Sequence, residues 1–399
     1  MQLTANSQTK SSENGLDEMK PSIIGVGSTT FREHWHYGLR EMIRFATSNA
    51  LKSANIELKE IDSLFVANCF GSTINGQNNI NALCSDELGI QNSVAISGGD
   101  AAGAYAIVQA ANSILSKQNK ISLVIGVEKM SDMPITDMTK IVSEVTEQEY
   151  EASTGATLAS LYAMITLIHM KLYGTTNKQL SMVSIKNHSN AVENEIAQFR
   201  FKVAMDDIAK SPMVADPIRL LHSAPHSDGC CALIMCNEEM AKKYKDKIQI
   251  IGTGIGADFM AVHEREDITT FNAVSSASKT AIAKAGIKIE DISFAEIHDS
   301  FSIGEIISLE DIGFAKKGTG GKFVEEGNAD LYGKIPINPS GGLKGCGHPF
   351  AATGIRQAIE SFYQLNGTAG KRQVKNPKYA LTENISGTGA TAVVNIYSL

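Results

Sequence analysis

The sequence lacks the features that mark secreted, membrane-spanning and nucleic-acid-binding proteins. Its cysteines form no Cys-x-x-Cys motif and no paired framework, which favours reduced thiols in a cytoplasmic protein. No apolar run reaches the ~18 residues that a membrane-spanning helix needs. The net charge of −7 argues against general nucleic-acid binding, although a local basic patch could still hold a phosphate. The six cysteines are Cys69, Cys84, Cys230, Cys231, Cys236 and Cys346.

What remains is an ordinary globular composition, with 43% hydrophobic and 20% charged residues. A chain of 399 residues exceeds one ordinary core, so we expect two domains or two fused half-domains. Residues 1–21 are polar and lack the apolar stretch of a secretory signal, and we interpret them as a disordered lead-in.

An internal repeat supports the two-part organisation. The string ALKSANIELKEI at 50–61 returns as AIAKAGIKIEDI at 281–292. Each copy has the pattern of an amphipathic helix end, a turn and a strand. A looser pair of small-residue helices opens at 99–103 and 347–352. Alternating strands and helices, present twice, predict two similar α/β halves.

The predicted halves are residues 22–248 and 249–399. Within the first, residues 130–248 have no counterpart in the second half. They contain helical stretches followed by proline-bearing loops. An insertion of this size on an α/β core is typical of a segment that covers the active site and binds substrate.

Six strings occur in a fixed order: GVEKMS at 126–131, HMKLYGTT at 169–176, SDG at 227–229, HDSF at 298–301, NPSGGLKGCGHPFAATG at 338–354 and NISGTGATAVV at 384–394. Together these strings resemble the thiolase superfamily in its sterol-carrier-protein and archaeal-type branch. This resemblance runs from about residue 22 to the C-terminus. The resemblance implies an α/β fold of two duplicated βαβαβαββ halves in a five-layered α-β-α-β-α arrangement, with an inserted loop domain.

The cysteines of thiolase chemistry are missing from these strings. The resemblance places the nucleophilic cysteine on Asp100 and the second cysteine of the branch on Ser300. A carboxylate is a poorer nucleophile than a thiolate toward a thioester, and the mixed anhydride it would form is easily hydrolysed. Asp100 is equally well explained as a helix N-cap, and the two interpretations are compatible. Ser300 is equally well explained as a hydroxyl that fills the space of the cysteine.

The histidines of the site are retained. His348 matches the family histidine that polarises the thioester oxygen or activates the nucleophile, and His298 matches one that helps to form the oxyanion hole. Their neutral N–H groups could bind an enolate oxygen that develops from a thioester. We therefore predict Asp100, His298, Ser300 and His348 as the catalytic residues.

Other candidates concern the coenzyme A part of the substrate. The resemblance implies an acyl-CoA thioester as substrate, with no permanently bound cofactor and no metal. Basic residues of the inserted region are candidate CoA contacts, although a solvated surface explains them equally well. Glycines in two loops suit turns where backbone approaches a ligand. The predicted contacts are Lys186, Arg219, Gly341, Gly387 and Gly389.

The sequence is compatible with three functions. The first is carbon–carbon bond cleavage or formation on acyl-CoA thioesters through an enolate-stabilising histidine pair, without a cysteine-linked acyl-enzyme. Cysteine-free relatives of this kind are aldolases with a small OB-fold/zinc-ribbon partner, but they tend to have tyrosines where this chain has histidines. The second is a non-catalytic subunit that binds CoA esters or stabilises an active partner. The third is a conventional acetyl-CoA C-acyltransferase. The resemblance also implies a homodimer or tetramer.

Overall fold

A computed structural model describes residues 20–399, so residues 1–19 of the expected lead-in lie outside the described residues. Nine strands hydrogen-bond in the order β3-β2-β4-β7-β1-β8-β11-β10-β9. The two halves meet where β1 pairs with β8, through Ser22↔Gln249 and Ile23↔Ile248. The strands are β1 (Ser22–Ser28), β2 (Ser63–Ala67), β3 (Ser93–Ile96), β4 (Ile121–Glu128), β7 (Gly229–Cys236), β8 (Ile248–Ala257), β9 (Phe294–Glu296), β10 (Tyr379–Ser386) and β11 (Thr391–Ser398).

Each half repeats the same order of elements. The first half runs β1-α1-β2-α3-β3-α4-β4 and, after the insertion, β7. The second half runs from β8 through α10, β9, α11 and α14 to β10 and β11. The place of its third strand is held by a single bridge, Ala295↔Ile337. The main helices are α1 (Leu39–Ala54), α3 (Ile80–Leu88), α4 (Ala102–Leu115), α10 (Asn272–Ala285), α11 (Ser302–Ile312) and α14 (Phe350–Leu365).

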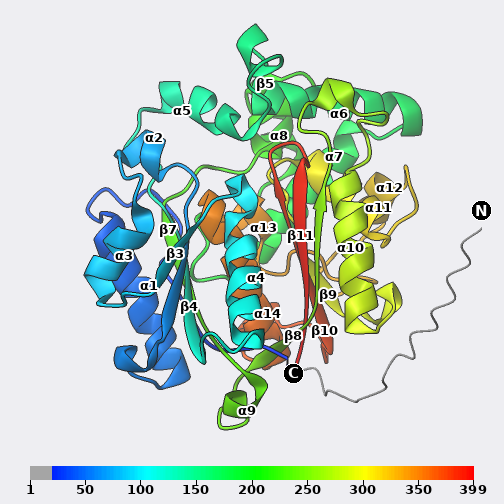
Figure 1. The fold of residues 1–399 in the computed structure, drawn as a ribbon. Helices are drawn as coiled ribbons and strands as arrows, with labels where there is room; N and C mark the ends of the chain where they lie inside the picture. Colours follow the sequence, from blue (N-terminus) through cyan, green and yellow to red (C-terminus); the bar gives the residue numbers. More distant parts are fainter. Residues whose placement is uncertain (1–19) are drawn as a thin grey trace, which may run out of the picture.

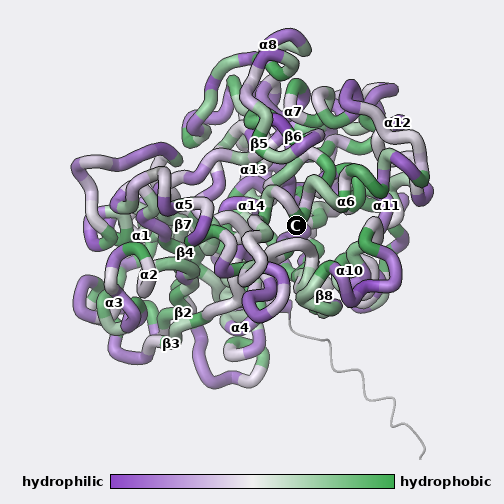
Figure 2. The backbone as a smooth tube through the Cα atoms, turned by 90° about the horizontal axis from the view of Figure 1, so that it is seen from above, coloured by the Kyte–Doolittle hydropathy of each residue, from purple (hydrophilic) through white to green (hydrophobic). Residues whose placement is uncertain are grey.

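These elements form the layers that the family resemblance implies (Figure 1). Helices α1 and α3 pack on the outer face of the first half of the sheet, and α10 packs on β8 and β11 at the opposite side. Helices α4 and α14 pack on each other between the two halves. Figure 2 shows hydrophobic segments along the strands and the inner helix faces, with hydrophilic segments in many peripheral loops. Short helices complete the core: α2 (Gly71–Asn75), α9 (Glu238–Ala241), α12 (Gly320–Glu325) and α13 (Gly342–Cys346).

The inserted loop domain lies at the top of the molecule in Figure 1. Its predicted end near residue 248 is wrong, because β7 is a core strand of the first half. Every residue of β7 is buried, and the strand pairs antiparallel with both β1 and β4. The insertion therefore ends before Gly229. It contains α5 (Ile135–Val142), α6 (Leu158–Tyr173), α7 (Asn177–Ala191), α8 (Met205–Lys210), β5 (Met213–Ala215) and β6 (Ile218–Arg219).

None of the helices in residues 20–399 combines the length and apolarity required to cross a bilayer.

Glycines allow the two central helices to approach closely. A Cβ on Gly103 of α4 would lie 2.2 Å from the carbonyl oxygen of Ala351 on α14. In the reciprocal position, a Cβ on Gly354 of α14 would lie 2.6 Å from the backbone nitrogen of Ala104. Both contacts involve backbone atoms, which cannot move aside as the end of a flexible side chain can.

We predict that Gly103→Ala lowers the free energy of unfolding by about 1–3 kcal/mol, because the added methyl group overpacks the helix contact. Urea unfolding followed by circular dichroism measures the change. Gly304→Ala in α11 is the matched control, since the nearest atom to its added Cβ is 3.5 Å away. The control should be neutral or stabilising by roughly 0.5–1 kcal/mol, because glycine weakens a helix interior. Equal effects of the two substitutions would contradict the close-contact interpretation.

Candidate active site

Asp100 lies in a short 3₁₀ turn, Gly99–Ala101, that leads directly into α4. The turn is tight because Gly99 has a φ of 57° and its hydrogen faces the Ser386 side chain. The Asp100 side chain is completely buried, and neither carboxylate oxygen has a hydrogen-bond partner within residues 20–399. The N-cap interpretation of Asp100 is therefore wrong, because Ala101 is the N-cap of α4 and the Asp100 side chain makes no hydrogen bond in the part of the chain that the structure describes.

His298 and His348 are each anchored by their backbone and by Nδ1. The N–H of His298 donates to Glu383 Oε2 at 2.7 Å, and its Nδ1 accepts from Asn384 Nδ2 at 2.9 Å. The N–H of His348 donates to Ser227 Oγ at 3.0 Å, and its Nδ1 lies 2.8 Å from Thr353 Oγ1. Both rings are thereby held with Nε2 directed away from these partners.

The two rings and the Asp100 carboxylate converge. Asp100 Oδ2 lies 3.7 Å from His298 Nε2 and 3.5 Å from His348 Nε2. The ring centroids are 5.1 Å apart and the rings are perpendicular. Among the described residues, neither Nε2 has a hydrogen-bond partner. The structure thus brings together three of the four predicted catalytic residues, at separations slightly longer than direct hydrogen bonds.

Burial controls the charges in this cluster. It lowers the pKa of His298 to about 3, an effect strengthened by His348 and opposed by Asp100. Burial likewise holds the pKa of His348 well below its usual range, with further lowering by His226 and Arg356. Both rings are therefore neutral at pH 7, and their contacts with Asp100 are not ion pairs.

The Asp100 carboxyl is affected in the opposite direction. Burial raises the pKa of Asp100 to about 6, while His298 and the nearby backbone N–H groups of Asp100 and Gly387 oppose the rise. Those N–H groups are close enough to influence the charge, but they do not meet hydrogen-bond geometry. A buried carboxylate without a donor thus faces two neutral imidazoles.

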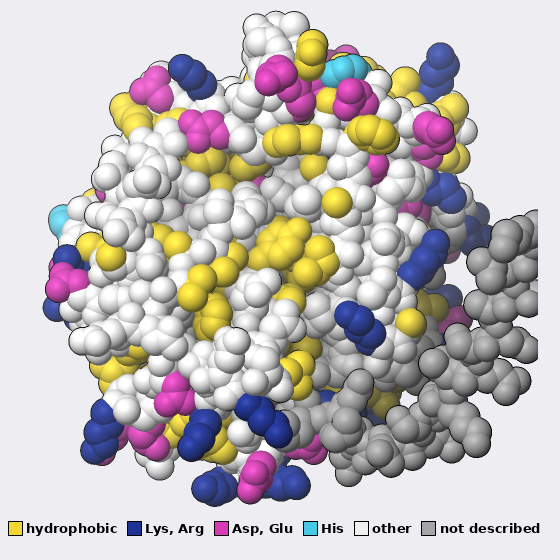
Figure 3. Space-filling model, viewed as in Figure 1, with side chains coloured by type: hydrophobic (Ala, Val, Ile, Leu, Met, Phe, Trp, Pro, Cys, Tyr) yellow, Lys and Arg dark blue, Asp and Glu magenta, His cyan; other side chains and the backbone are white. Residues whose placement is uncertain are grey.

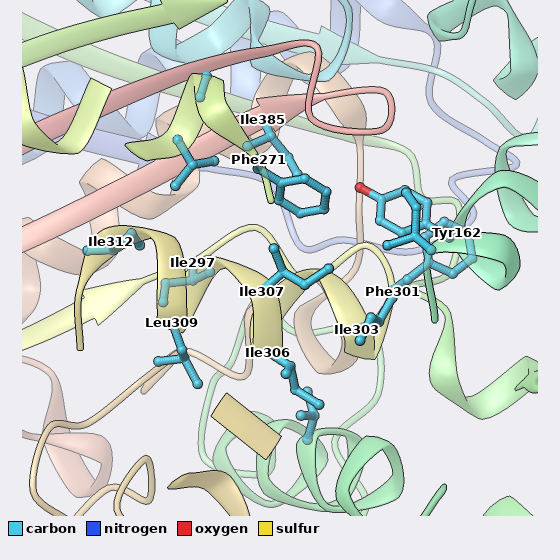
Figure 4. Close-up of a cluster of buried hydrophobic side chains, with 14 of the residues drawn as sticks. Tyr162, Phe271, Ile297, Phe301, Ile303, Ile306, Ile307, Leu309, Ile312 and Ile385 are labelled. Carbon is cyan, nitrogen blue, oxygen red and sulfur yellow. The ribbon is translucent and has the colours of Figure 1, made fainter. Parts of the chain in front are cut away.

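Ser300, the fourth predicted catalytic residue, contacts Tyr162. Its hydroxyl is beside the hydroxyl of Tyr162, which donates to the carbonyl oxygen of Gly387 at 3.0 Å. Tyr162 comes from α6 of the inserted domain and stacks on Phe301, with ring centroids 4.5 Å apart (Figure 4). The insertion therefore contributes a side chain that holds the Gly387 turn, whose N–H points toward the Asp100 region.

Sequence reasoning missed Tyr162, Thr353 and Asn384. Tyr162 lies in an apolar helical segment whose pattern predicts a core position, so nothing in the sequence marks it as a residue of the site. Thr353 and Asn384 lie inside strings already identified as motifs, and their hydrogen-bonding side chains next to the two histidine motifs were the available signal.

Of the predicted CoA contacts, Lys186 is already engaged. Its ammonium lies 3.1 Å from Glu305 Oε1 and donates to the carbonyl oxygen of Ile337 at 2.9 Å, in a buried network. The expected contact with a phosphate is therefore corrected, since no free ammonium is presented to solvent. Arg219 is partly exposed and uses Nη1 to bind the carbonyl oxygen of Ser211.

The predicted glycines serve tight backbone positions. Gly341, Gly387 and Gly389 all have positive φ. A Cβ on Gly341 would meet Ala191 at 2.6 Å, and one on Gly389 would meet the Phe271 ring at 2.7 Å. These two glycines pack against protein. Gly387 differs, because its backbone N–H lies near the Asp100 carboxylate.

The 223–228 segment connects the buried site with the surface. Ser223 forms an isolated bridge with Phe301, and His226 forms one with His348. His348 is 3% exposed, whereas the neighbouring His226 is exposed. The site therefore approaches solvent beside His226.

Comparison with known proteins gives two family matches. The model described as "Thiolase, N-terminal domain" matches residues 22–239, and "Thiolase C-terminal domain-like" matches residues 254–399. The acetyl-CoA acetyltransferase of Methanothermobacter thermautotrophicus is 41% identical over 380 residues, covering 94% of this chain and 99% of that protein. Bovine (Bos taurus) sterol carrier protein 2 is 31% identical over 395 residues, covering 94% of this chain and 72% of that protein.

Solved structures show the same fold. The Ltp2-ChsH2(DUF35) aldolase superimposes with a TM-score of 0.81 at 21% identity, covering 94% of this chain and 97% of that chain. Human mitochondrial 3-ketoacyl-CoA thiolase superimposes with a TM-score of 0.74 at 16% identity, covering 95% of this chain and 99% of that chain. At these identities the likeness concerns the fold alone.

The loop that holds His348 depends on a second buried carboxylate, Asp228. Asp228 accepts hydrogen bonds from the N–H groups of His34, Met130 and Ser131, and pairs with Lys129 Nζ at 2.9 Å. Burial alone would raise the pKa of Asp228, but the hydroxyl of Ser131, these N–H groups and the ammonium outweigh it and lower the pKa.

We predict that Asp228→Asn destabilises the protein by about 3–5 kcal/mol at pH 7, because Lys129 loses its buried partner. The folded-state pKa of Asp228 is depressed, so its contribution exists above the unfolded value of about 3.9 and is lost as pH falls through the lower folded value. Urea unfolding should therefore show the difference between wild type and variant shrinking below about pH 4.

Asp132→Asn is the control for this prediction. Asp132 pairs with the same ammonium at 2.8 Å but is half exposed. Solvent screening should limit its effect at pH 7 to about 1 kcal/mol or less. A difference between Asp228→Asn and wild type that grows on acidification would contradict the prediction.

Proposed function

The chain belongs to the thiolase family, and from that premise we propose that it catalyses carbon–carbon bond chemistry at the α-carbon of acyl-CoA thioesters without an acyl-enzyme. The observation that carries the proposal is the convergence of Asp100 with two neutral histidines. The family resemblance sets a nucleophilic cysteine at this position. A carboxylate there is better suited to accept a proton than to hold an acyl group.

The geometry supports an enolate-forming site. Because Nδ1 of His298 accepts from Asn384, its Nε2 carries the proton and is a hydrogen-bond donor. The Thr353 hydroxyl can impose the same state on His348. Two neutral N–H donors would then face the thioester oxygen, where negative charge develops when the α-carbon is deprotonated.

The proton follows a simple path in this proposal. The Asp100 carboxylate takes a proton from the α-carbon, and the electron pair moves to the thioester oxygen held by the two Nε2–H groups. The enolate carbon then attacks a carbonyl carbon, and the oxygen of that carbonyl takes the proton held by Asp100. In the cleavage direction, the carboxylate takes the proton of a β-hydroxyl, the carbon–carbon bond breaks, and the enolate is reprotonated at its α-carbon.

A conventional acyltransferase mechanism would require a thiolate. Burial, Glu128 and Asp100 all raise the pKa of the Cys69 thiol well above its usual range. Burial raises the pKa of Cys346 to about 12. Both thiols are therefore protonated at neutral pH, and neither is a ready substitute for the nucleophile.

For the assembly, we propose a homodimer that forms through the edge strand β3. Val94 is 42% exposed, and β3 pairs on one side only, with β2. A cavity of about 740 Å³ adjoins the strand and is lined partly by Ala95, Ile96 and Tyr105. The space-filling view shows hydrophobic side chains across this face (Figure 3).

The aldolase neighbour carries a DUF35 protein in its name, so a partner subunit is a further proposal for this chain.

We predict that the metal-free protein exchanges the α-protons of acetyl-CoA with deuterium oxide. Asp100→Asn should slow this exchange by at least about 100-fold, because the amide cannot accept the proton. Mass spectrometry of the recovered thioester measures the exchange. This assay requires a base and an enolate-binding site but no acyl-enzyme.

Asp100→Cys provides the matched control. It should gain a covalent acetyl adduct, detected by intact-protein mass, whereas wild type should show none. An adduct on wild type would contradict the proposal in favour of the conventional acyltransferase. Exchange that is undetectable in wild type, with the CoA ester bound, would favour a non-catalytic CoA-binding subunit.

We further predict that Val94→Lys converts the dimer to a monomer, because a lysine on an edge strand opposes pairing with a second strand. Light scattering coupled to size exclusion measures the mass, and circular dichroism checks the fold. Lys117→Ala, a change of a surface lysine just beyond α4, should leave the dimer intact. A wild-type monomer, or a Val94→Lys dimer, would exclude this interface.

A further inference from the structure

The site contains four polar atoms that the protein itself does not satisfy. Both carboxylate oxygens of Asp100, Nε2 of His298 and Nε2 of His348 are buried and lack hydrogen-bond partners among residues 20–399. The three residues are between 0% and 3% exposed. Burying a polar group without a partner is costly, and native proteins contain few such groups. Asp100 Oδ2 lies 3.7 Å from His298 Nε2 and 3.5 Å from His348 Nε2, so a group bound among these three atoms would satisfy them.

The separations fit a metal ion better than direct contact. One oxygen or nitrogen from each of the three side chains lies within 4.8 Å of the others, and the two carboxylate–imidazole separations are 3.7 and 3.5 Å. Metal–ligand bonds of about 2.0–2.1 Å in tetrahedral geometry place ligand atoms about 3.3 Å apart. Direct hydrogen bonds would be shorter, at about 2.7–3.2 Å.

We propose that Asp100, His298 and His348 form a binding site for a divalent transition-metal ion of the zinc class. Two imidazoles and one carboxylate suit zinc, cobalt or iron better than magnesium or calcium, which prefer oxygen ligands. Three protein ligands leave a fourth position for a water molecule. The site differs from the sequence-based expectation of no metal.

The ligands are held in place by the fold before any ion binds. Asp100 precedes α4, His348 precedes α14, and these helices pack directly on each other. His298 is fixed through its N–H to Glu383 and His348 through its N–H to Ser227. A preformed arrangement of this kind lowers the cost of gathering three ligands around an ion.

The hydrogen-bond partner of each Nδ1 determines whether Nε2 offers a lone pair to a metal ion or a proton to an enolate. A metal needs the lone pair of Nε2, so the ring proton must be on Nδ1 and the partner of Nδ1 must accept it. The Thr353 hydroxyl can accept as well as donate. For His298, the Asn384 amide must turn over to present its Oδ1, which has no partner in the observed orientation. Asn384 is thereby a positioning residue for His298.

The two uses of the site exclude each other. With the ion bound, the Nε2 atoms no longer donate, and the carboxylate is a ligand rather than a base. We therefore infer that the ion regulates the site by competing with the CoA thioester. This regulatory part rests on the proposed function, whereas the binding part rests on the geometry alone.

Cobalt tests binding without any measurement of activity. The full-length protein is treated with a chelator and titrated with Co²⁺. One equivalent should produce the intense visible absorption of tetrahedral cobalt, and Zn²⁺ should displace it. Asp100→Asn should lose this absorption, whereas His263→Gln, which removes a surface histidine beside Glu151, should keep it. Absence of the band, or an unchanged band in Asp100→Asn, would overturn the metal site.

Asn384→Asp gives a second variant that keeps all three ligands. An aspartate accepts the Nδ1 proton of His298, so Co²⁺ should bind about 10–100-fold more tightly than to wild type. Equal or weaker binding, with circular dichroism unchanged, would contradict the role of Asn384.

Deuterium exchange by the chelator-treated protein separates this inference from the proposed function. Exchange without metal, suppressed by one equivalent of Zn²⁺, would support both. Exchange that persists without any cobalt band would overturn the metal site and retain the function. A cobalt band without exchange in the metal-free protein would retain the metal site and reject the function. Exchange that requires Zn²⁺ would overturn the competition.

Discussion

The close packing of α4 against α14 is the contact on which the site depends. Each helix offers a glycine to the backbone of the other, Gly103 to Ala351 and Gly354 to Ala104. Asp100 and His348 each lie two residues before the start of one of these helices. A shift of one helix along the other would therefore separate a carboxylate and an imidazole that are now 3.5 Å apart. Because both helices begin at the site, their dipoles also favour negative charge there.

Burial then decides what this geometry can do. It removes the positive charge from both histidines and raises the pKa of the carboxyl that faces them. Surface residues with the same separations would form weak, screened ion pairs. Here neutral imidazoles present either a proton or a lone pair at Nε2, and Thr353 and Asn384 influence which. The hydrogen bonds of Thr353 and Asn384 to the two rings therefore determine whether each Nε2 is a donor or a ligand.

The sequence predicts the fold and most of the site, and its failures have physical causes. The motifs around Asp100, His298 and His348 locate side chains far apart in the chain, and the structure brings them together. The end of the insertion is misplaced because β7 is apolar throughout and carries no alternation that would mark a sheet strand. Lys186 is misassigned because a lysine is expected at the surface. In the structure it is buried, and its ammonium pairs with the buried carboxylate of Glu305.

Tyr162 shows a different limit, since its hydroxyl acts across 225 residues of sequence on the carbonyl oxygen of Gly387. No local pattern encodes such a contact. It depends on how the inserted domain lies over the core, and that placement depends in turn on the packing of α6 and Phe301. The surroundings of the Asp100 carboxylate likewise depend on segments that are far apart in the sequence. Burying a carboxylate without a hydrogen-bond partner is costly, and each of the two proposed ligands would offset that cost in a different way. The proposed metal ion would bind one oxygen of Asp100 and Nε2 of both histidines. The proposed enolate oxygen would accept from both Nε2–H groups once Asp100 has taken the proton of the α-carbon.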